Sequence, residues 1–177
     1  RDPSIVNVPD SRGRTALVAV VVSNKTNAAE MTRLLLSRRA DVEARFGLLK
    51  MTPLHAAVQG GLDDVAALLT QAHADVNAKM QGGITPLMLA VSKNRSGAIG
   101  LRLKAGADPH VVNEKGQAAV HMAAGADQTA VVRQLLAGGA NPNQVEPGEH
   151  GTPLAKAAYY GRRELVEALL AGGANPN

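Results

Sequence analysis

The chain has 177 residues, no cysteine and a net charge of +4, and aromatic residues make up only 2% of it. The lack of cysteine excludes disulfide and zinc–thiolate scaffolds and fits a reducing compartment, so we expect an intracellular protein, cytoplasmic or nuclear. The sequence has no apolar run near the roughly 20 residues that a membrane-spanning helix needs.

The positive charge is concentrated near the N-terminus. Residues 1–51 contain nine Lys and Arg against five Asp and Glu, whereas residues 52–177 contain ten of each. This excess fits either a solvated surface without a binding role or a docking end for an acidic partner, whose association it would accelerate.

Two short sequence motifs recur along the chain. Thr-Pro-Leu stands at 52–54, 85–87 and 152–154, so the first interval is 33 residues and the second is twice that plus one. A second motif, typified by Ala74-Asp75-Val76-Asn77, has five copies, which end at residues 43, 77, 110, 143 and 177. Five copies at a period near 33 indicate one supersecondary unit stacked upon itself. We therefore expect an N-terminal approach of residues 1–9 and one repeat domain of residues 10–177, with repeats at 10–45, 46–78, 79–111, 112–144 and 145–177.

The turns that open the repeats differ in polarity. Segments 10–13 and 113–116 are polar and contain glycine, as turns usually are. The turn that opens the second repeat instead carries Phe46, Leu48, Leu49 and Met51. Exposed, these side chains would mark an interaction site; alternatively, the turn folds back and buries them.

The third repeat shows the helix signals and also a defect. Thr85 suits a helix N-cap and Pro86 the first helical position, while Gly106 suits the end of the second helix. Gly97, Gly100 and Arg102 fall within that second helix, where each glycine costs about 0.5–1 kcal/mol relative to alanine. We expect a weak or displaced helix near 96–104, with the stem of Arg102 buried and its charged head at the surface. Alternatively, Arg102 pairs with an acid of a neighbouring repeat.

The fifth repeat has the clearest plan, with helices over 152–160 and 163–171 separated by Gly161. Two of the three aromatic residues, Tyr159 and Tyr160, end its first helix. Tyrosine is enriched among interface hot spots, so this pair predicts a contact surface. The alternative is that the tyrosines pack against a sixth repeat.

Catalytic and metal-binding motifs are missing from the sequence. It contains neither a zinc-protease HExxH nor a CxxC, a G-x-S-x-G or a phosphate-binding G-x-x-x-x-G-K-[ST] motif. The five histidines are not paired at helical spacing, and Asp63-Asp64 opens a helix, where acidic residues favour the helix dipole. We therefore predict no enzyme, no cofactor and no metal site.

The repeated unit resembles the ankyrin repeat. Thr52-Pro53-Leu54-His55-Ala56-Ala57 reproduces the T-P-L-H-x-A motif of that family, and the Ala-Asp-x-Asn ending fits as well. The resemblance implies an all-α repeat solenoid of five stacked helix-turn-helix ankyrin repeats joined by β-turn or hairpin loops. It also implies that the motif histidines, His55 and His121, bond to backbone near the neighbouring turn, and that His73 ends a helix.

The resemblance further implies a non-catalytic scaffold that binds a partner protein or peptide on a concave face of turn tips and inner helices. The partner we expect is acidic with apolar anchors, and the segment would be a monomeric module of a larger chain. Nucleic-acid or acidic-surface binding through the basic first repeat has weaker support, because the basic residues are scattered and lack interleaved aromatics. A targeting module of a larger enzyme or channel is a further alternative. The residues expected to contact the partner are Arg12, Arg14, Leu48, Leu49, Met51, Ile84, Lys93, Lys156, Tyr159 and Tyr160.

Overall fold

A computed structural model describes residues 3–23, 26–148 and 151–177. Across these residues ten α-helices follow one another in pairs, with two short 3-10 helices, η1 (Pro3–Asn7) and η2 (Gln81–Gly83). Within the same ranges, the single isolated β-bridge joins Phe46 to Met51. The predicted all-α repeat architecture is confirmed, and the chain forms two compact units, residues 1–81 and residues 82–177.

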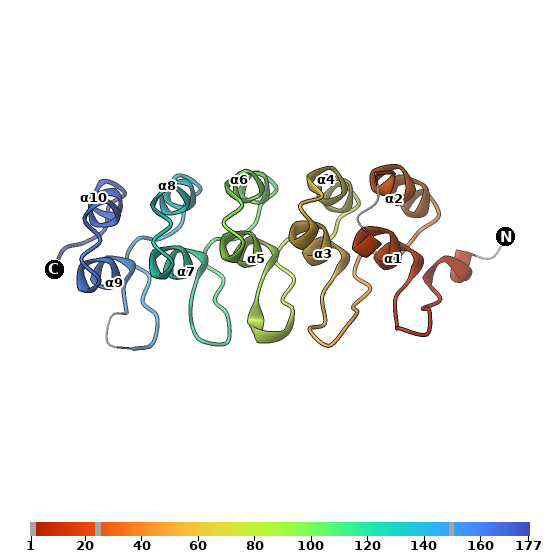
Figure 1. Cartoon of the computed structure of the whole chain (residues 1–177), viewed down its shortest axis with the longest axis horizontal. Coiled ribbons are helices and arrows are strands. Elements are labelled where there is room, and N and C mark those ends of the chain that lie inside the picture. The colour runs from red at the N-terminus through yellow and green to blue at the C-terminus, as the bar shows by residue number, and fades with distance from the viewer. Residues whose placement is uncertain (1–2, 24–25, 149–150) are drawn as a thin grey trace. The chain divides into compact units, whose positions relative to one another are not determined.

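The first unit contains two helix pairs, which Figure 1 shows in red to olive. Helix α1 packs against α2 and α3, α2 packs against α4, and α3 packs against α4. The core is made of small aliphatic side chains, of which Leu17, Leu54 and Leu69 are fully buried. The bounds are α1 Ala16–Ser23, α2 Ala28–Ser37, α3 Pro53–Gly60 and α4 Asp63–Gln71.

The second unit contains three helix pairs in two rows. The first helices, α5, α7 and α9, lie side by side, and the second helices, α6, α8 and α10, form the other row (Figure 1). Leu87, Leu135 and Leu169 are fully buried between the rows. The bounds are α5 Pro86–Ser92, α6 Ser96–Lys104, α7 Ala119–Gly125, α8 Thr129–Ala137, α9 Pro153–Tyr159 and α10 Arg163–Ala171.

The recurring Thr-Pro pair starts the first helix of a repeat, as predicted. The hydroxyls of Thr52, Thr85 and Thr152 cap α3, α5 and α9, and each accepts a hydrogen bond from the backbone N–H three residues later, at 3.1–3.4 Å. Proline then takes the first turn, where its missing N–H leaves no backbone acceptor without a partner. In the fourth repeat Ala118 stands in place of threonine, and the ring Nδ1 of His121 accepts from its N–H at 3.1 Å instead.

Each second helix is followed by a residue in the left-handed region. Gly106, Gly139 and Gly173 hold this position with φ of 86°, 88° and 89°, where glycine carries no steric penalty. Arg39 and His73 hold it in the first two repeats, with φ of 63° and 64°. The predicted role of His73 as a helix-end residue is therefore confirmed.

Helix α6 corrects the expectation for the third repeat. It runs unbroken over nine residues, as long as α8 and α10, and packs against α5 and α8, so the predicted displacement is not observed. The predicted surface position of the Arg102 head is wrong, because the whole side chain is only 2% exposed. Arg102 occupies the position of Leu135 and Leu169 in the next repeats, which is the centre of the buried helix face rather than its edge. A side chain there has no short path to solvent.

The N-terminal segment is joined to the first repeat by the side chain of Asn7. Its Oδ1 accepts from the N–H of Asp41 at 2.8 Å, and its Nδ2 donates to the carbonyl of Arg39 at 3.2 Å. Asn143 makes the same two bonds four repeats further along the chain, to residues 175 and 173. Residues 4–7 therefore take the place of the motif that ends a repeat. This was not predicted from the sequence, although Val6-Asn7 matches Val76-Asn77.

Candidate binding surfaces

The apolar turn of the second repeat is a closed hairpin. Phe46 and Met51 exchange two backbone hydrogen bonds, of 3.0 and 3.1 Å, around a four-residue loop. Leu48 at its tip is 93% exposed and Leu49 is 47% exposed, whereas Met51 is only 8% exposed. The sequence left open whether the apolar residues of this turn are exposed or buried, and each alternative holds for part of it. The leucines at the tip face solvent, whereas the methionine is buried.

Contacts from residues outside the turn hold the hairpin in place. The N–H of Gln81 donates to the carbonyl of Leu49 at 2.8 Å. Nη1 of Arg45 donates to the carbonyls of Lys50 at 3.3 Å and Lys79 at 2.8 Å. These bonds join the hairpin to residues 79–81 of the first unit, so its shape does not rely on the loop alone.

The polar turns are built differently. Oδ1 of Asp10 accepts from the N–H groups of Arg12 and Arg14, at 2.8 and 2.9 Å, and Asn113 repeats this arrangement with Lys115 and Gln117. Phe46 replaces the Asp or Asn and offers no side-chain acceptor. The hairpin closes instead with two backbone hydrogen bonds between Phe46 and Met51, and it is one residue longer than the polar turns.

The two arginines expected at the tip of the first turn have different surroundings. Arg12 is exposed, whereas Arg14 forms an ion pair with Asp10 at 2.8 Å. The hydrogen bond from the Arg14 side chain, with help from backbone N–H groups, lowers the pKa of Asp10 to about 2. Arg12 is thus the more available cation for a partner.

A shallow groove of about 320 Å³ lies beside the hairpin in the first unit. Val22, on α1, is exposed at this groove, and Phe46 is half-buried in it. The remaining lining comes from α1 and α3, so the groove lies between these inner helices and the turn. Its lining residues are Val21, Val22, Phe46, Ala56, Gln59 and Gly60.

In the second unit, the remaining predicted contact residues lie at different depths. Ile84 is half-buried ahead of the Thr85 cap, and Lys93 is exposed at the end of α5. Gly125 and Ala126 hold the corresponding position on α7, and Tyr159 and Tyr160 hold it on α9. Because α5, α7 and α9 are neighbours, these helix ends form one edge of the second unit.

The tyrosine pair is exposed and ordered. Tyr159 and Tyr160 are 65% and 57% exposed, and their rings meet edge to face at 5.1 Å. The guanidinium of Arg162 lies 4.8 Å from the centre of the Tyr160 ring and donates to the carbonyls of Ala124 and Gly125. Arg162 thus fixes Tyr160 against the preceding repeat, a role that sequence reading missed. The only sign of this contact in the sequence is the position of Arg162, two residues after Tyr160.

Lys156 is less available than expected. Its ammonium forms an ion pair with Glu146, which is buried, and burial lowers the pKa of Lys156. The N–H of Glu146 also donates to the carbonyl of Gly151 at 2.7 Å, so Glu146 is bonded both to Lys156 and to the segment that leads into α9. The Lys156 ammonium is therefore already engaged within the chain.

His121 has the structural role that the family resemblance implied. Because its Nδ1 accepts from Ala118, its Nε2 carries the proton and donates to the carbonyl of Gln144 at 2.7 Å. Burial lowers the pKa of His121, an effect that the bond to Gln144 partly opposes and nearby Lys156 reinforces. The ring is therefore a neutral link between turn and helix.

Within residues 3–23, 26–148 and 151–177, no group of three or more His, Asp or Glu side chains could hold a metal ion. In the same part of the chain, no helix is both long enough and apolar enough to cross a bilayer.

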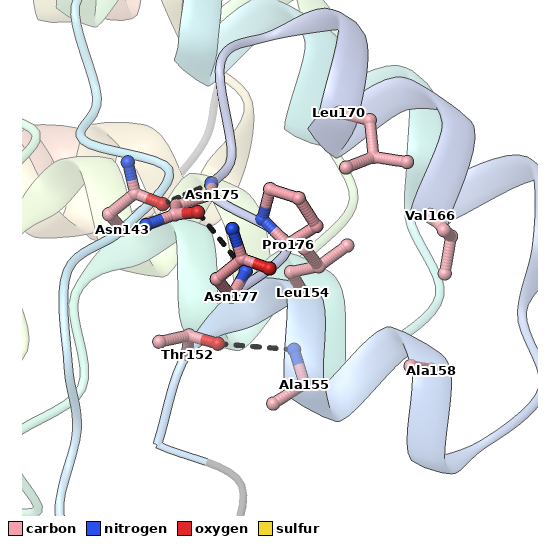
Figure 2. A pocket seen from close by; sticks show the side chains of 10 residues that line it. All are labelled: Asn143, Thr152, Leu154, Ala155, Ala158, Val166, Leu170, Asn175, Pro176 and Asn177. Carbon is pink, nitrogen blue, oxygen red and sulfur yellow. Dashed lines mark hydrogen bonds between the residues drawn. The ribbon is translucent and has the colours of Figure 1, made fainter.

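A pocket of about 640 Å³ lies between α9, α10 and the chain ending, and Figure 2 shows its lining. Leu154, Val166 and Leu170 supply apolar surface, while Thr152 is occupied in capping α9. Leu170 corresponds to Leu136, whose side chain lies against Gly172 of the next repeat, and Asn177 corresponds to Asn143. The pocket thus repeats the surface by which one repeat holds the next, which explains its apolar lining without a small-molecule ligand.

Comparisons with known proteins agree with this architecture. Over 89 residues the chain is 33% identical to the I-Kappa-B like protein H1 of Microplitis demolitor bracovirus (isolate Webb). This match covers 50% of the chain and 46% of the viral protein, so the chain spans about half the length of that curated relative. The crystal structure of an ankyrin repeat domain from Acinetobacter baumannii AYE is similar with a TM-score of 0.85 and 26% identity, over 97% of this chain and 87% of that one.

The sequence profile described as ankyrin repeats (3 copies) matches residues 2–80 and 87–177. These ranges contain all ten helices except the first residue of α5. The chain therefore belongs to the ankyrin-repeat family.

Proposed function

We propose that this chain is a non-catalytic binding module for a partner protein, which contacts the turn tips and the ends of the inner helices. Ankyrin repeats generally mediate protein–protein interactions, and arrays of this kind are typically non-catalytic. Fold alone does not assign a partner, so the proposal depends on the surfaces of this particular chain.

The observation that carries the proposal is the exposure of large apolar and aromatic side chains at a turn tip and at the end of an inner helix. Leu48 and Leu49 in the first unit, and Tyr159 and Tyr160 in the second, are large apolar or aromatic residues in solvent. Each pair is held by defined contacts rather than by a loose loop. Ordered apolar surface of this kind favours association with another protein.

The surrounding charges suggest the chemistry of the partner. Arg12, Lys50 and Lys93 are exposed and would attract carboxylates, while Arg14 and Lys156 are already paired within the chain. Met51 and Ile84 are more enclosed, and we propose that each supports the contact surface of its own unit from below. The partner would therefore combine apolar anchors with acidic groups.

The test is the triple substitution of Leu48, Leu49 and Tyr160 by alanine, followed by binding measurements with partners recovered by pulldown. Because these side chains are exposed, the variant should keep its circular dichroism spectrum and unfolding midpoint. We expect at least a tenfold loss of affinity, about 1.4 kcal/mol, which is modest for several hot-spot residues. Leu34→Ala combined with Leu101→Ala removes comparably exposed leucines from the second helices α2 and α6 and serves as the control. Equal affinity of the folded triple variant and the control would refute the assignment.

The basic first repeat also supports a competing function, the binding of nucleic acid or an acidic surface. Phosphate contacts would make the logarithm of the affinity fall steeply and linearly with the logarithm of salt concentration. We expect a shallow dependence, since the proposed contacts are largely apolar. A slope that indicates several released counterions would favour the competing function.

The intracellular location and the activity of any larger protein remain predictions.

A further inference from the structure

The hairpin over residues 46–51 is a protrusion rather than a hollow. Leu48 stands at its tip with 93% of its surface in solvent, and no other large apolar side chain in the described part of the chain is as exposed. A convex tip cannot enclose a bound peptide. It can be buried only if the partner provides the cavity.

The tip is prepared for such burial, because its backbone is already fixed. Phe46 and Met51 close the loop with two hydrogen bonds, and Gln81 binds the carbonyl of Leu49. Gly47 and Lys50 take left-handed conformations, with φ of 66° and 53°, which set the direction of the two leucines. A loop that is ordered before binding loses little conformational entropy on binding.

The hairpin and the segments bonded to it carry exposed positive charges. Arg45, Lys50 and Lys79 are exposed around the hairpin, and the bonds of Arg45 to two carbonyls leave its charge in place. The sequence has no Asp or Glu between Glu43 and Asp63. A partner that approaches the leucine tip therefore meets a positive rim, which favours carboxylates at matching positions.

We infer that this hairpin inserts Leu48 into an apolar pocket, bordered by carboxylates, on the surface of a folded partner protein. The inference rests on the proposed function and narrows it, because it specifies the shape and charge of the partner's site. Leu49 would cover the pocket edge, while Arg45 and Lys50 would face the acidic border.

The test places a diazirine-bearing amino acid at position 48 by amber suppression and, in separate preparations, at positions 160 and 34. After irradiation in lysate, mass spectrometry identifies the cross-linked residues on the partner. Position 34, on α2, is a leucine of ordinary surface exposure and serves as the background control. We expect position 48 to cross-link to residues that line an apolar pocket with Asp or Glu at its border.

Affinity measurements with the purified cross-linked partner complete the test. We expect Leu48→Ala to weaken binding at least tenfold, and Lys50→Gln to slow association severalfold at low salt and less at high salt. Leu34→Ala and Arg33→Gln should change neither quantity by more than twofold.

The other outcomes separate this inference from the proposed function. Cross-links from position 48 to a disordered peptide segment or a flat surface would overturn the pocket. So would binding to phosphatidylserine vesicles that Leu48→Ala abolishes. Specific cross-links from position 160 with none from position 48 would overturn the inference and leave the proposed function standing. Cross-links from neither position above the level of position 34 would contradict both.

Discussion

The side chain of Asn143 bridges two repeats by accepting a hydrogen bond from the N–H of Asn175 at 2.7 Å and donating one to the carbonyl of Gly173 at 3.2 Å. The fourth and fifth repeats are thus joined by polar bonds as well as by apolar packing. Glu43 makes the corresponding acceptor bond to the N–H of Asp75, also at 2.7 Å. A side chain with an oxygen acceptor at this position links repeats within both units.

We predict that Asn143→Ala lowers the free energy of unfolding by about 0.5–1.5 kcal/mol, since it removes net hydrogen bonding at an exposed site. Asn143→Asp keeps the acceptor, as Glu43 does, and should lose less. Urea unfolding of the two variants measures the difference. If Asn143→Asp is as destabilised as Asn143→Ala, the bond to Asn175 does not stabilise the array.

Helix α6 contains two glycines that the fold does not require. A Cβ built at Gly97 or Gly100 meets no atom within 4 Å, so alanine fits both positions. We predict that each substitution stabilises the protein by about 0.5–1 kcal/mol. Amide exchange in α6 should be faster than in α10 of the natural chain and should slow in the Gly97→Ala, Gly100→Ala double variant.

Gly83→Ala is the matched control for this prediction. There φ is +70°, and an added Cβ would lie 2.8 Å from the backbone nitrogen of Glu114, so destabilisation is expected. An α6 that already exchanges as slowly as α10 would remove the basis for the weak-helix account.

Arg102 lies where neighbouring repeats place a core leucine. Replacing buried ion pairs by apolar side chains of similar volume is often neutral or stabilising by about 1–4 kcal/mol, and leucine is the residue that α8 and α10 carry at this position. We therefore expect Arg102→Leu to unfold at the same or a higher temperature. The reverse substitution, Leu135→Arg, should destabilise by roughly 3 kcal/mol or more because it buries a charge in the same environment. A marked loss of stability in Arg102→Leu would show that the guanidinium has a role leucine cannot replace.

The buried His121 predicts a dependence of stability on pH. Burial lowers its pKa in the folded state, so the unfolded chain binds the proton more readily. Its contribution is therefore complete above the ordinary histidine pKa of about 6.5 and is lost as the pH falls below it. Denaturant midpoints at pH 8 and pH 5 should differ less in His121→Gln than in the natural chain. His110→Gln, at an exposed histidine, should keep the full difference; the same flattening in both variants would exclude His121 as the source.

The fold followed from local signals because each one acts within a few residues. Thr85 caps α5 through an N–H three residues away, and Gly106 ends α6 through its own backbone conformation. Such effects appear in the sequence as fixed spacings. The helix pairs of all five repeats could be predicted on that basis.

The binding surfaces could be predicted only in part, because their details depend on distant contacts. Leu48 and Met51 are three residues apart, yet only one is exposed, and Gln81 helps to fix that arrangement from 32 residues beyond Leu49. Lys156 was expected to be available to a partner, but its ion pair with Glu146, ten residues away, could not be predicted from the sequence. The guanidinium of Arg102 was wrongly expected at the surface, because its burial depends on the packing of α6 against α5 and α8.

The central claim, that a partner protein is bound by the turn tips and inner-helix ends, is tested most directly by hydrogen exchange of the chain with and without a purified partner. The account predicts slowed exchange at residues 46–51 and around Tyr159 and Tyr160, with α2, α8 and α10 unchanged. Protection confined to the second helices, with the hairpin and the tyrosines unaffected, would contradict it.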